Sequence, residues 1–288
     1  MKKIKQKSIK KSVELSGIGL HTGNPAKIQF SPAPIGAGIF FRRTDLPGSP
    51  TIRADIDEVS EVFRGTTIGK GANVVNTVEH VMSAVYGLEI SNLEIGISGG
   101  EPPACDGSAR PFVSLLIEAG IEEQNDYTEE IGLNTPFSVK EGEKTLEYQP
   151  SENLEITFTM DYSEQELKQK KHFVFSSEKY IDEISFARTF GFVHEFEMLK
   201  AKQIALGGSL ENAVVVNLDS SILNPEGLRD PEEFVKHKIL DLFGDLALIG
   251  KRFRGHIIAN KTGHATNIKF ARKFREILNH EKERKKKI

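Results

Sequence analysis

Residues 230–245 have the sequence Asp230-Pro231-Glu232-Glu233-Phe234-Val235-Lys236-His237-Lys238-Ile239-Leu240-Asp241-Leu242-Phe243-Gly244-Asp245. This stretch predicts a helix with a capped start. Asp230 is a good N-cap, Pro231 suits the first helical position, and Glu233 would complete a capping box. Gly250, which precedes two cationic residues, is the expected stop.

On this helix His237, Asp241 and Asp245 follow one another at intervals of four residues, so they lie about 40° apart on one narrow strip. The apolar residues of the stretch occupy a different arc. A His and an Asp at i and i+4 can bind a single ion, as a helical metal site requires. The more frequent alternative for such a pair is a surface strip on which both side chains are only hydrogen-bonded.

Length and composition exclude several classes of protein. A chain of 288 residues can bury one large core or two ordinary ones. A net charge of -3 gives no reason to expect nucleic acid as a partner. We expect no membrane insertion, because no run of about 18 apolar residues is present. The basic segments 2–11 and 282–287 are expected to be solvated tails, with contact to an anionic membrane surface or to nucleic acid as the alternatives.

The cysteine content bears on both the compartment and the metal. The start of the chain lacks the apolar segment of a signal peptide, and the single cysteine, Cys105, fits a reducing compartment, so a cytoplasmic location is expected. One cysteine also excludes a thiolate-rich zinc site. Any metal in this protein has to be bound by histidine and carboxylate side chains.

The order of predicted elements repeats itself along the chain. Alternating segments bounded by turns predict strands at 12–15, 26–30, 38–43, 51–54 and 93–97, then at 137–140, 144–149, 154–160, 172–175, 213–218 and 256–259. Helices are expected at 76–87, 112–119, 183–189, 230–250 and 268–278. This order favours an α+β fold of two similar halves. The acidic segment 122–130 is the expected boundary, which gives domains 1–126 and 127–288.

A second pair of chemically useful residues lies near the start of the helix expected at 76–87. Glu79 and His80 are adjacent there, and Ala84 excludes the zincin pattern. Glu79 is also explained by ordinary helix-dipole chemistry. A catalytic zinc site usually has three protein ligands and one position for water. His80, His237 and Asp241 would form such a set, with Glu79 as the base that acts on the water.

A set of short segments, spread over nearly the whole chain, carries a more specific pattern: Ser16-Gly17-Ile18-Gly19-Leu20-His21-Thr22-Gly23, Thr77-Val78-Glu79-His80, Asp106-Gly107-Ser108, Ala187-Arg188-Thr189-Phe190-Gly191-Phe192, Gly207-Gly208-Ser209, Asn224-Pro225-Glu226-Gly227-Leu228-Arg229, His237 to Asp245, and Gly263-His264-Ala265-Thr266-Asn267. In these segments the sequence resembles the zinc-dependent UDP-3-O-acyl-N-acetylglucosamine deacetylases of lipid A biosynthesis. The segments occur in the order found in that family.

The resemblance implies two α+β domains packed through their helices, a β-α-α-β layered sandwich with the site between them. It implies hydrolysis of the substrate's N-acetyl group, which gives UDP-3-O-acyl-glucosamine and acetate. It also implies one zinc ion held by His80, His237 and Asp241. Ferrous iron would fit the same ligands.

The resemblance further implies a role for each residue around the ion. Glu79 would be the general base, and His264, oriented by Asp245, would be the acid toward the leaving amine. Thr189 and Lys238 would bind the oxyanion and the substrate. An amide needs these functions, because water has to lose a proton, the carbonyl oxygen gains charge and the departing nitrogen needs a proton.

Substrate contacts are implied on both sides of this centre. Tyr162, Lys238 and Lys261 would bind the nucleotide, with Tyr162 stacked on uracil and Lys261 at the diphosphate. Phe190, in a matching segment, is also expected at the substrate. The family has an apolar passage for the acyl chain, which maps here to 192–213, with Phe196 as a lining residue. Many members have a cysteine where this chain has Ala205, so the preferred acyl length stays open.

Two other functions are compatible with the same residues. One is a nucleotide-sugar or glycolipid binding protein with an inactive site, although such a site should have lost a residue, and none is missing among Glu79, His80, His237, Asp241 and His264. The other is a different zinc amidase on the same scaffold. We expect the partner to be a small acylated UDP-sugar and the protein to be a monomer.

Overall fold

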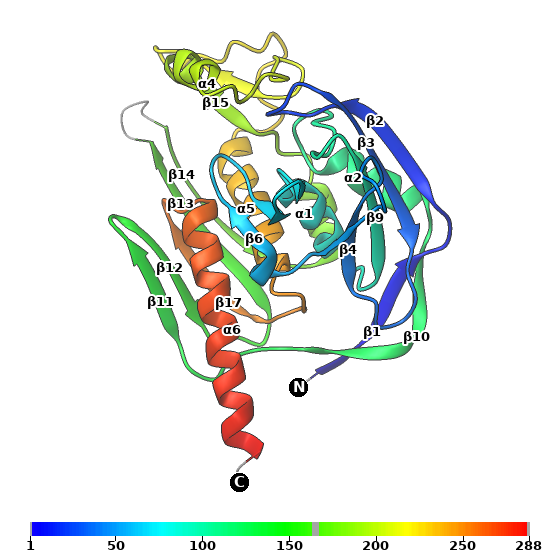
Figure 1. The fold of residues 1–288 in the computed structure, drawn as a ribbon. Coiled ribbons are helices and arrows are strands. Elements are labelled where there is room, and N and C mark those ends of the chain that lie inside the picture. Colours follow the sequence, from blue (N-terminus) through cyan, green and yellow to red (C-terminus); the bar gives the residue numbers. More distant parts are fainter. Residues whose placement is uncertain (1, 163–166, 287–288) are drawn as a thin grey trace.

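Two five-stranded sheets form the outer layers of the molecule (Figure 1). The structure is a computed structural model that describes residues 2–162 and 167–286. The first sheet has the strand order β2-β3-β9-β4-β5. Its strands are β2 (Val13–Ile18), β3 (Pro25–Pro32), β4 (Ile39–Arg43), β5 (Thr51–Arg53) and β9 (Leu93–Ser98).

The second sheet repeats this topology with the order β11-β12-β17-β13-β14. In both sheets the last strand in the sequence lies in the middle, antiparallel to the second strand and parallel to the third. The two halves expected from the sequence are therefore similar in topology. The strands of the second sheet are β11 (Phe137–Glu141), β12 (Lys144–Gln149), β13 (Leu154–Tyr162), β14 (Leu167–Val174) and β17 (Gly255–Asn260).

Helices fill the space between the sheets. Helices α1 (Glu79–Gly87) and α2 (Arg110–Glu118) belong to the first half, and α5 (Glu233–Ala247) and α6 (His264–Lys286) belong to the second. α1 packs against α5, and α5 and α6 pack on the strands of the second sheet. The layers therefore run sheet, helices, helices, sheet, and the α+β fold class is confirmed.

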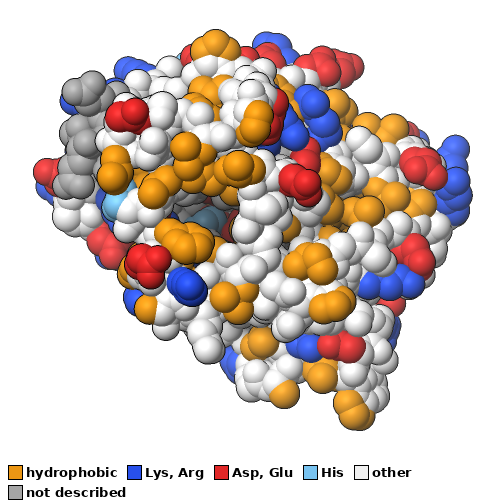
Figure 2. All heavy atoms as spheres, turned by 90° about the horizontal axis from the view of Figure 1, so that it is seen from above, with side chains coloured by type: hydrophobic (Ala, Val, Ile, Leu, Met, Phe, Trp, Pro, Cys, Tyr) orange, Lys and Arg blue, Asp and Glu red, His pale blue; other side chains and the backbone are white. Residues whose placement is uncertain are grey.

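Smaller elements sit around these layers. A three-stranded sheet follows η1 (Ile56–Glu58) and consists of β6 (Val59–Glu61), β7 (Thr67–Lys70) and β8 (Asn73–Val75). A separate lobe at the top of Figure 1 contains β15 (Phe190–Phe192), η4 (Val193–Glu195), α4 (Phe196–Ala201) and β16 (Val214–Val216). Figure 2 views this lobe from above and shows hydrophobic side chains gathered around a hollow, with histidine visible inside it.

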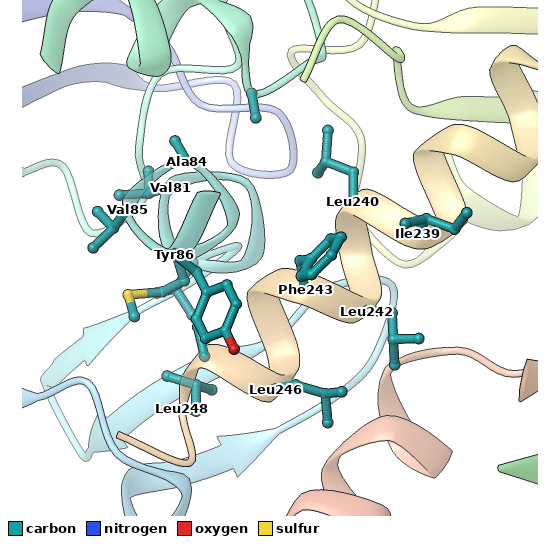
Figure 3. Packing of buried hydrophobic residues seen from close by; sticks show 14 of the residues in the cluster. Val81, Ala84, Val85, Tyr86, Ile239, Leu240, Leu242, Phe243, Leu246 and Leu248 are labelled. Carbon is teal, nitrogen blue, oxygen red and sulfur yellow. The ribbon is translucent and has the colours of Figure 1, made fainter. Parts of the chain in front are cut away.

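The helix α5 is the centre of the core. Nearly every side chain from Glu233 to Ala247 is buried. Figure 3 shows Tyr86 of α1 beside Phe243 of α5, and their ring centroids are 5.8 Å apart. Gly244 permits this packing, because a Cβ there would lie 2.0 Å from the carbonyl oxygen of Glu79.

The ends of the chain differ from our expectation. Residues 2–11 were expected to be a solvated tail, but Lys2–Ile9 forms strand β1, which pairs antiparallel with β10 (Ile121–Glu130). Lysines of β1 lie opposite glutamates of β10, which favours the pairing. The segment 122–130, where we place the domain boundary, is therefore a strand. The basic segment at the other end continues α6 as far as Lys286, and Lys287 lies outside the described residues.

Two predicted helix positions are also wrong. The helix expected at 183–189 lies earlier, as α3 (Ser177–Lys179) and the π-helical turn η3 (Tyr180–Ile184), because the Ser176 side chain caps its start. Helix α6 begins at His264 rather than at residue 268. Helix α5 begins at Glu233 with Glu232 as its N-cap, so Asp230 is not the N-cap that we predicted and Pro231 precedes the helix, although Asp230 accepts a hydrogen bond from the Glu232 N–H. Glu233 forms no capping box, since its carboxylate binds Arg188.

No helix in residues 2–162 or 167–286 combines the length and the apolar character needed to span a bilayer.

Candidate active site

Three potential metal ligands meet where α1 crosses α5. The ligand atoms of His80, His237 and Asp241 all lie within 4.8 Å of one another. Oδ1 of Asp241 is 3.3 Å from Nε2 of His237 and 3.7 Å from Nε2 of His80. His237 and Asp241, one turn apart on α5, thus lie together with His80, the second residue of α1.

The chemistry of these donors fits a divalent metal. The Nδ1 of His237 lies 3.0 Å from the Ala187 carbonyl oxygen, so Nδ1 carries the proton and Nε2 keeps its lone pair for a metal. Burial lowers the pKa of His237 to about 4, which keeps the ring neutral at pH 7. Although burial opposes ionisation, His237 and Lys238 hold the pKa of Asp241 well below its usual range. Two imidazoles and one carboxylate suit zinc or ferrous iron.

Glu79 is a buried carboxylate beside this cluster. Its Oε2 accepts a hydrogen bond of 2.9 Å from the backbone N–H of Thr66. Burial raises the pKa of Glu79 above its usual value. A carboxylate with a raised pKa is a stronger base than one in water, which suits proton abstraction.

His264, the first residue of α6, forms a second catalytic-type pair with Asp245 of α5. Its Nδ1 lies 2.9 Å from Oδ2 of Asp245, and Asn267 donates to the same oxygen over 2.8 Å. Although burial opposes a charge on the ring, the carboxylates of Asp245 and Glu79 raise the pKa of His264 to about 9. The imidazole is therefore protonated at pH 7 and able to act as an acid.

The imidazole of His264 lies close to the carboxylates of Glu79 and Asp241. The Nε2 of His264 is 3.9 Å from Oε1 of Glu79 and 4.0 Å from Oδ2 of Asp241. The structure thus brings together the five residues around which we predicted a centre: Glu79, His80, His237, Asp241 and His264.

A cleft of about 530 Å³ extends the site along the second sheet. Lys238, Tyr162 and Lys261 all line it. The ammonium of Lys238 lies 2.7 Å from Oδ2 of Asp241, and this carboxylate outweighs burial and keeps the pKa of Lys238 above its usual value. Lys261 forms ion pairs with Glu143 and Asp161, which also line this cleft.

The other predicted substrate residues lie on the upper lobe. Phe190 is close to the centre, with its ring centroid 6.1 Å from that of His237 and 5.9 Å from that of Tyr162. Thr189 lies two residues after Ala187, whose carbonyl binds His237. Phe196, the first residue of α4, is 60% exposed.

Two buried polar residues near the site, Thr66 and Glu101, were not predicted from the sequence. Thr66, between β6 and β7, contacts both Glu79 and Asp245. Glu101 is fully buried and accepts hydrogen bonds from the backbone of His21 and from the hydroxyl of Thr77. The sequence signal for Glu101 is weak: it is a single carboxylate between Gly99-Gly100 and Pro102-Pro103, in residues that predict a loop.

Comparison with known proteins agrees with this geometry. A family model described as LpxC, UDP-3-O-acyl N-acetylglycosamine deacetylase, matches residues 6–276. The chain belongs to this family. The resemblance noted in the sequence is thus confirmed, and the chain is a deacetylase, hence a hydrolase. Family membership also implies a metal-dependent enzyme, and the structure offers a His80, His237 and Asp241 group for the ion.

Curated relatives carry the same name, UDP-3-O-acyl-N-acetylglucosamine deacetylase. The protein of Citrifermentans bemidjiense is 43% identical over 92% of this chain and 87% of its own length. The protein of Marinobacter nauticus is 42% identical over 94% of this chain and 90% of its own length. The protein of Teredinibacter turnerae is 44% identical, with 92% and 88% of the two chains covered.

Proposed function

We propose that this deacetylase hydrolyses the N-acetyl group of UDP-3-O-acyl-N-acetylglucosamine, giving UDP-3-O-acyl-glucosamine and acetate, as an early committed step of lipid A biosynthesis. The observation that supports this best is the closeness of Glu79 and His264 to the His80, His237 and Asp241 group: Nε2 of His264 lies 3.9 Å from Oε1 of Glu79 and 4.0 Å from Oδ2 of Asp241. A base and an acid placed together beside a metal-type donor set are what amide hydrolysis requires.

The ion we propose is zinc, held by His80, His237 and Asp241, and ferrous iron fits the same donors. When bound, such an ion supplies a Lewis acid that polarises a carbonyl and lowers the pKa of water.

Glu79 takes one proton from the attacking water as the new C–O bond forms at the acetyl carbon. His264 then gives a proton from Nε2 to the sugar nitrogen, so that the C–N bond breaks and a neutral amine leaves. Asp245, at Nδ1 of His264, keeps the ring oriented for this transfer and stabilises its charged form. Glu79 is buried and the His264 side chain is only 13% exposed, which limits the access of bulk water to the proton transfers.

The remaining residues bind the substrate. Lys238 and Thr189 stabilise the charge that develops on the carbonyl oxygen. Tyr162 stacks on uracil. Lys261 meets the diphosphate, which replaces its ion pairs with Glu143 and Asp161. Phe190 borders the sugar, and the lobe at 192–213, including Phe196, receives the acyl chain.

Substitution of the proposed general base, Glu79, and of the proposed general acid, His264, tests the function. We expect Glu79→Ala and His264→Ala each to lower kcat by about 10²- to 10⁴-fold, with unchanged zinc content and thermal midpoint. His172→Ala, a histidine on the outer strand β14, is the matched control with wild-type turnover. Full activity in Glu79→Ala protein stripped of metal would contradict the proposal. Equal turnover of UDP-sugars with and without the acyl chain would instead indicate another amidase.

We further propose a monomer located in the cytoplasm, with domains 1–126 and 127–288. Size-exclusion chromatography with light scattering tests the oligomeric state, and a dimer at micromolar concentration would contradict it. Cell fractionation tests the location.

A further inference from the structure

Thr66 contacts two of the carboxylates to which the proposed reaction assigns a role. It lies between β6 and β7 and is fully buried. Its backbone N–H donates to Oε2 of Glu79 over 2.9 Å, and its hydroxyl donates to Oδ1 of Asp245 over 2.6 Å. One residue of the first half therefore touches both the base on α1 and the carboxylate on α5 that binds His264.

The hydroxyl of Thr66 complements the other partners of Asp245. Nδ1 of His264 and Nδ2 of Asn267 both bind Oδ2 of this carboxylate. Among residues 2–162 and 167–286, Thr66 is the hydrogen-bond donor that the structure gives to Oδ1. Hydrogen bonds at both oxygens prevent the carboxylate from rotating, and its orientation determines the plane of the His264 ring.

We infer that Thr66 is a positioning residue for the deacetylase reaction: it fixes Asp245, and through Asp245 it holds His264 so that Nε2 faces the leaving nitrogen. This inference rests on the proposed function. The Thr66 oxygen also lies 3.5 Å from Nδ1 of His264, so hydroxyl, carboxylate and imidazole form one contiguous network.

A threonine suits the positioning of Asp245, because its hydroxyl is less free to rotate than that of an unbranched side chain. Two heavy atoms on Cβ restrict χ1, so the hydroxyl of a buried threonine has few alternative directions. Loss of that hydroxyl would leave Oδ1 of a fully buried Asp245 without a donor. The carboxylate would then be free to turn toward other donors and to take the imidazole with it.

Three variants test the role of the hydroxyl. Thr66→Val removes it and keeps the shape and the backbone N–H, whereas Thr66→Ser keeps it. We expect Thr66→Val to lower kcat by about 10- to 100-fold with KM within about twofold, because misplacement of the acid acts on the chemical step. Thr66→Ser should recover most of the loss. Thr67→Val, which removes the neighbouring hydroxyl that binds Asn76, is the matched control with wild-type kcat.

The decisive comparison uses the His264→Ala background. Because Thr66 acts through Asp245 and His264, Thr66→Val should cause no further loss of kcat when His264 is absent. A loss of the same size in both backgrounds would overturn the inference, and so would wild-type kcat in Thr66→Val alone. If His264→Ala itself is fully active, the proposed function fails, whereas an inactive His264→Ala with a normal Thr66→Val rejects only the role of Thr66.

A measurement independent of turnover completes the test. In protein with ¹⁵N-labelled histidine, we expect the Nδ1–H resonance of His264 to shift or broaden in Thr66→Val and to return in Thr66→Ser. An unchanged resonance in Thr66→Val would overturn the inference. If Thr66→Val does not fold, Thr66→Ala replaces it, because it removes the same hydroxyl without placing a second methyl group beside Asp245.

Discussion

The α-carbon of Gly244 on α5 packs against the carbonyl oxygen of Glu79, the first residue of α1. A Cβ at position 244 would lie 2.0 Å from that oxygen and 2.8 Å from the Glu79 Cα. Glycine is unfavourable in a helix interior by about 1 kcal/mol. Here it lets the two helices cross closely, so that Glu79 and His80 of α1 lie beside His237 and Asp241 of α5.

Substitution of Gly244 should therefore separate the two helices. We expect Gly244→Ala to destabilise the protein by about 1–3 kcal/mol or more, since the new methyl group meets backbone atoms. Zinc content and turnover should fall together, because His80 moves away from His237 and Asp241. Thermal unfolding and metal analysis measure both effects. Gly191→Ala is the control, since no atom lies within 4 Å of the added Cβ. A wild-type midpoint in Gly244→Ala would contradict this account.

Removal of the metal should abolish turnover reversibly. We expect a chelator to inactivate the wild-type protein and added zinc to restore it. Zinc should also raise the thermal midpoint of the stripped protein, because a ligand that binds only the folded state stabilises it. Asp241→Ala should show neither effect at the same zinc concentration, with affinity lower by at least about a hundredfold. Zinc binding of wild-type strength in Asp241→Ala would disprove the ligand assignment.

The buried ion pair between Arg188 and Glu233 should be important for stability. Arg188 is bidentate on Glu233, with contacts of 2.8 and 3.1 Å, and neither side chain exceeds 1% exposure. We expect Arg188→Met to cost about 3–5 kcal/mol, because it leaves the Glu233 charge buried without its partner. Adding Glu233→Leu to this variant should recover part of the loss.

Glu226, a second and more exposed partner of the Arg188 guanidinium, provides the control for this ion pair. Glu226 also contacts Arg188 over 2.6 Å, but its side chain is 55% exposed. Glu226→Gln should therefore change the urea midpoint little. Equal losses in Glu226→Gln and Arg188→Met would show that burial does not decide the energy of these contacts.

Low pH should reduce the folding stability of the first half, because Asp45 becomes protonated. Hydrogen bonds from Arg43, with a further one from the Gly99 N–H, lower the pKa of Asp45 to about 2. The unfolded chain has the ordinary value of 3.8, so the stabilisation is complete above about pH 4 and is lost as the pH falls through 2. We expect the thermal midpoint difference between wild type and Asp45→Asn to shrink over this window. A difference independent of pH would contradict the expectation.

The sequence predicts the parts of the site that depend on local spacing. His237, Asp241 and Asp245 share a strip because four residues make slightly more than one helical turn, and tertiary packing leaves that relation unchanged. Glu79 and His80 are candidates because they are adjacent at a predicted helix start, and the resemblance to a family adds His264. No local period connects these three residues with the strip on α5. Their meeting depends on how α1, α5 and α6 cross.

The sequence does not predict features that depend on distant partners. Strand β1 pairs with residues more than a hundred positions away and is rich in lysine, so it lacks the alternation of a half-buried strand. The segment 183–189 has helical composition, but Arg188 there binds Glu233. Thr66 is a single hydroxyl in a connection, and only the folded chain brings it to Asp245.

The strand order has a consequence for synthesis on the ribosome. In each sheet the middle strand is translated last, as β9 in the first half and β17 in the second. The first sheet lacks its centre until residue 98 has emerged, and the second until residue 260. His264 follows only four residues later. A nascent chain therefore exposes a split second sheet from residue 174, where β14 ends, until residue 260, and it completes that sheet and gains its proton donor nearly at the same moment.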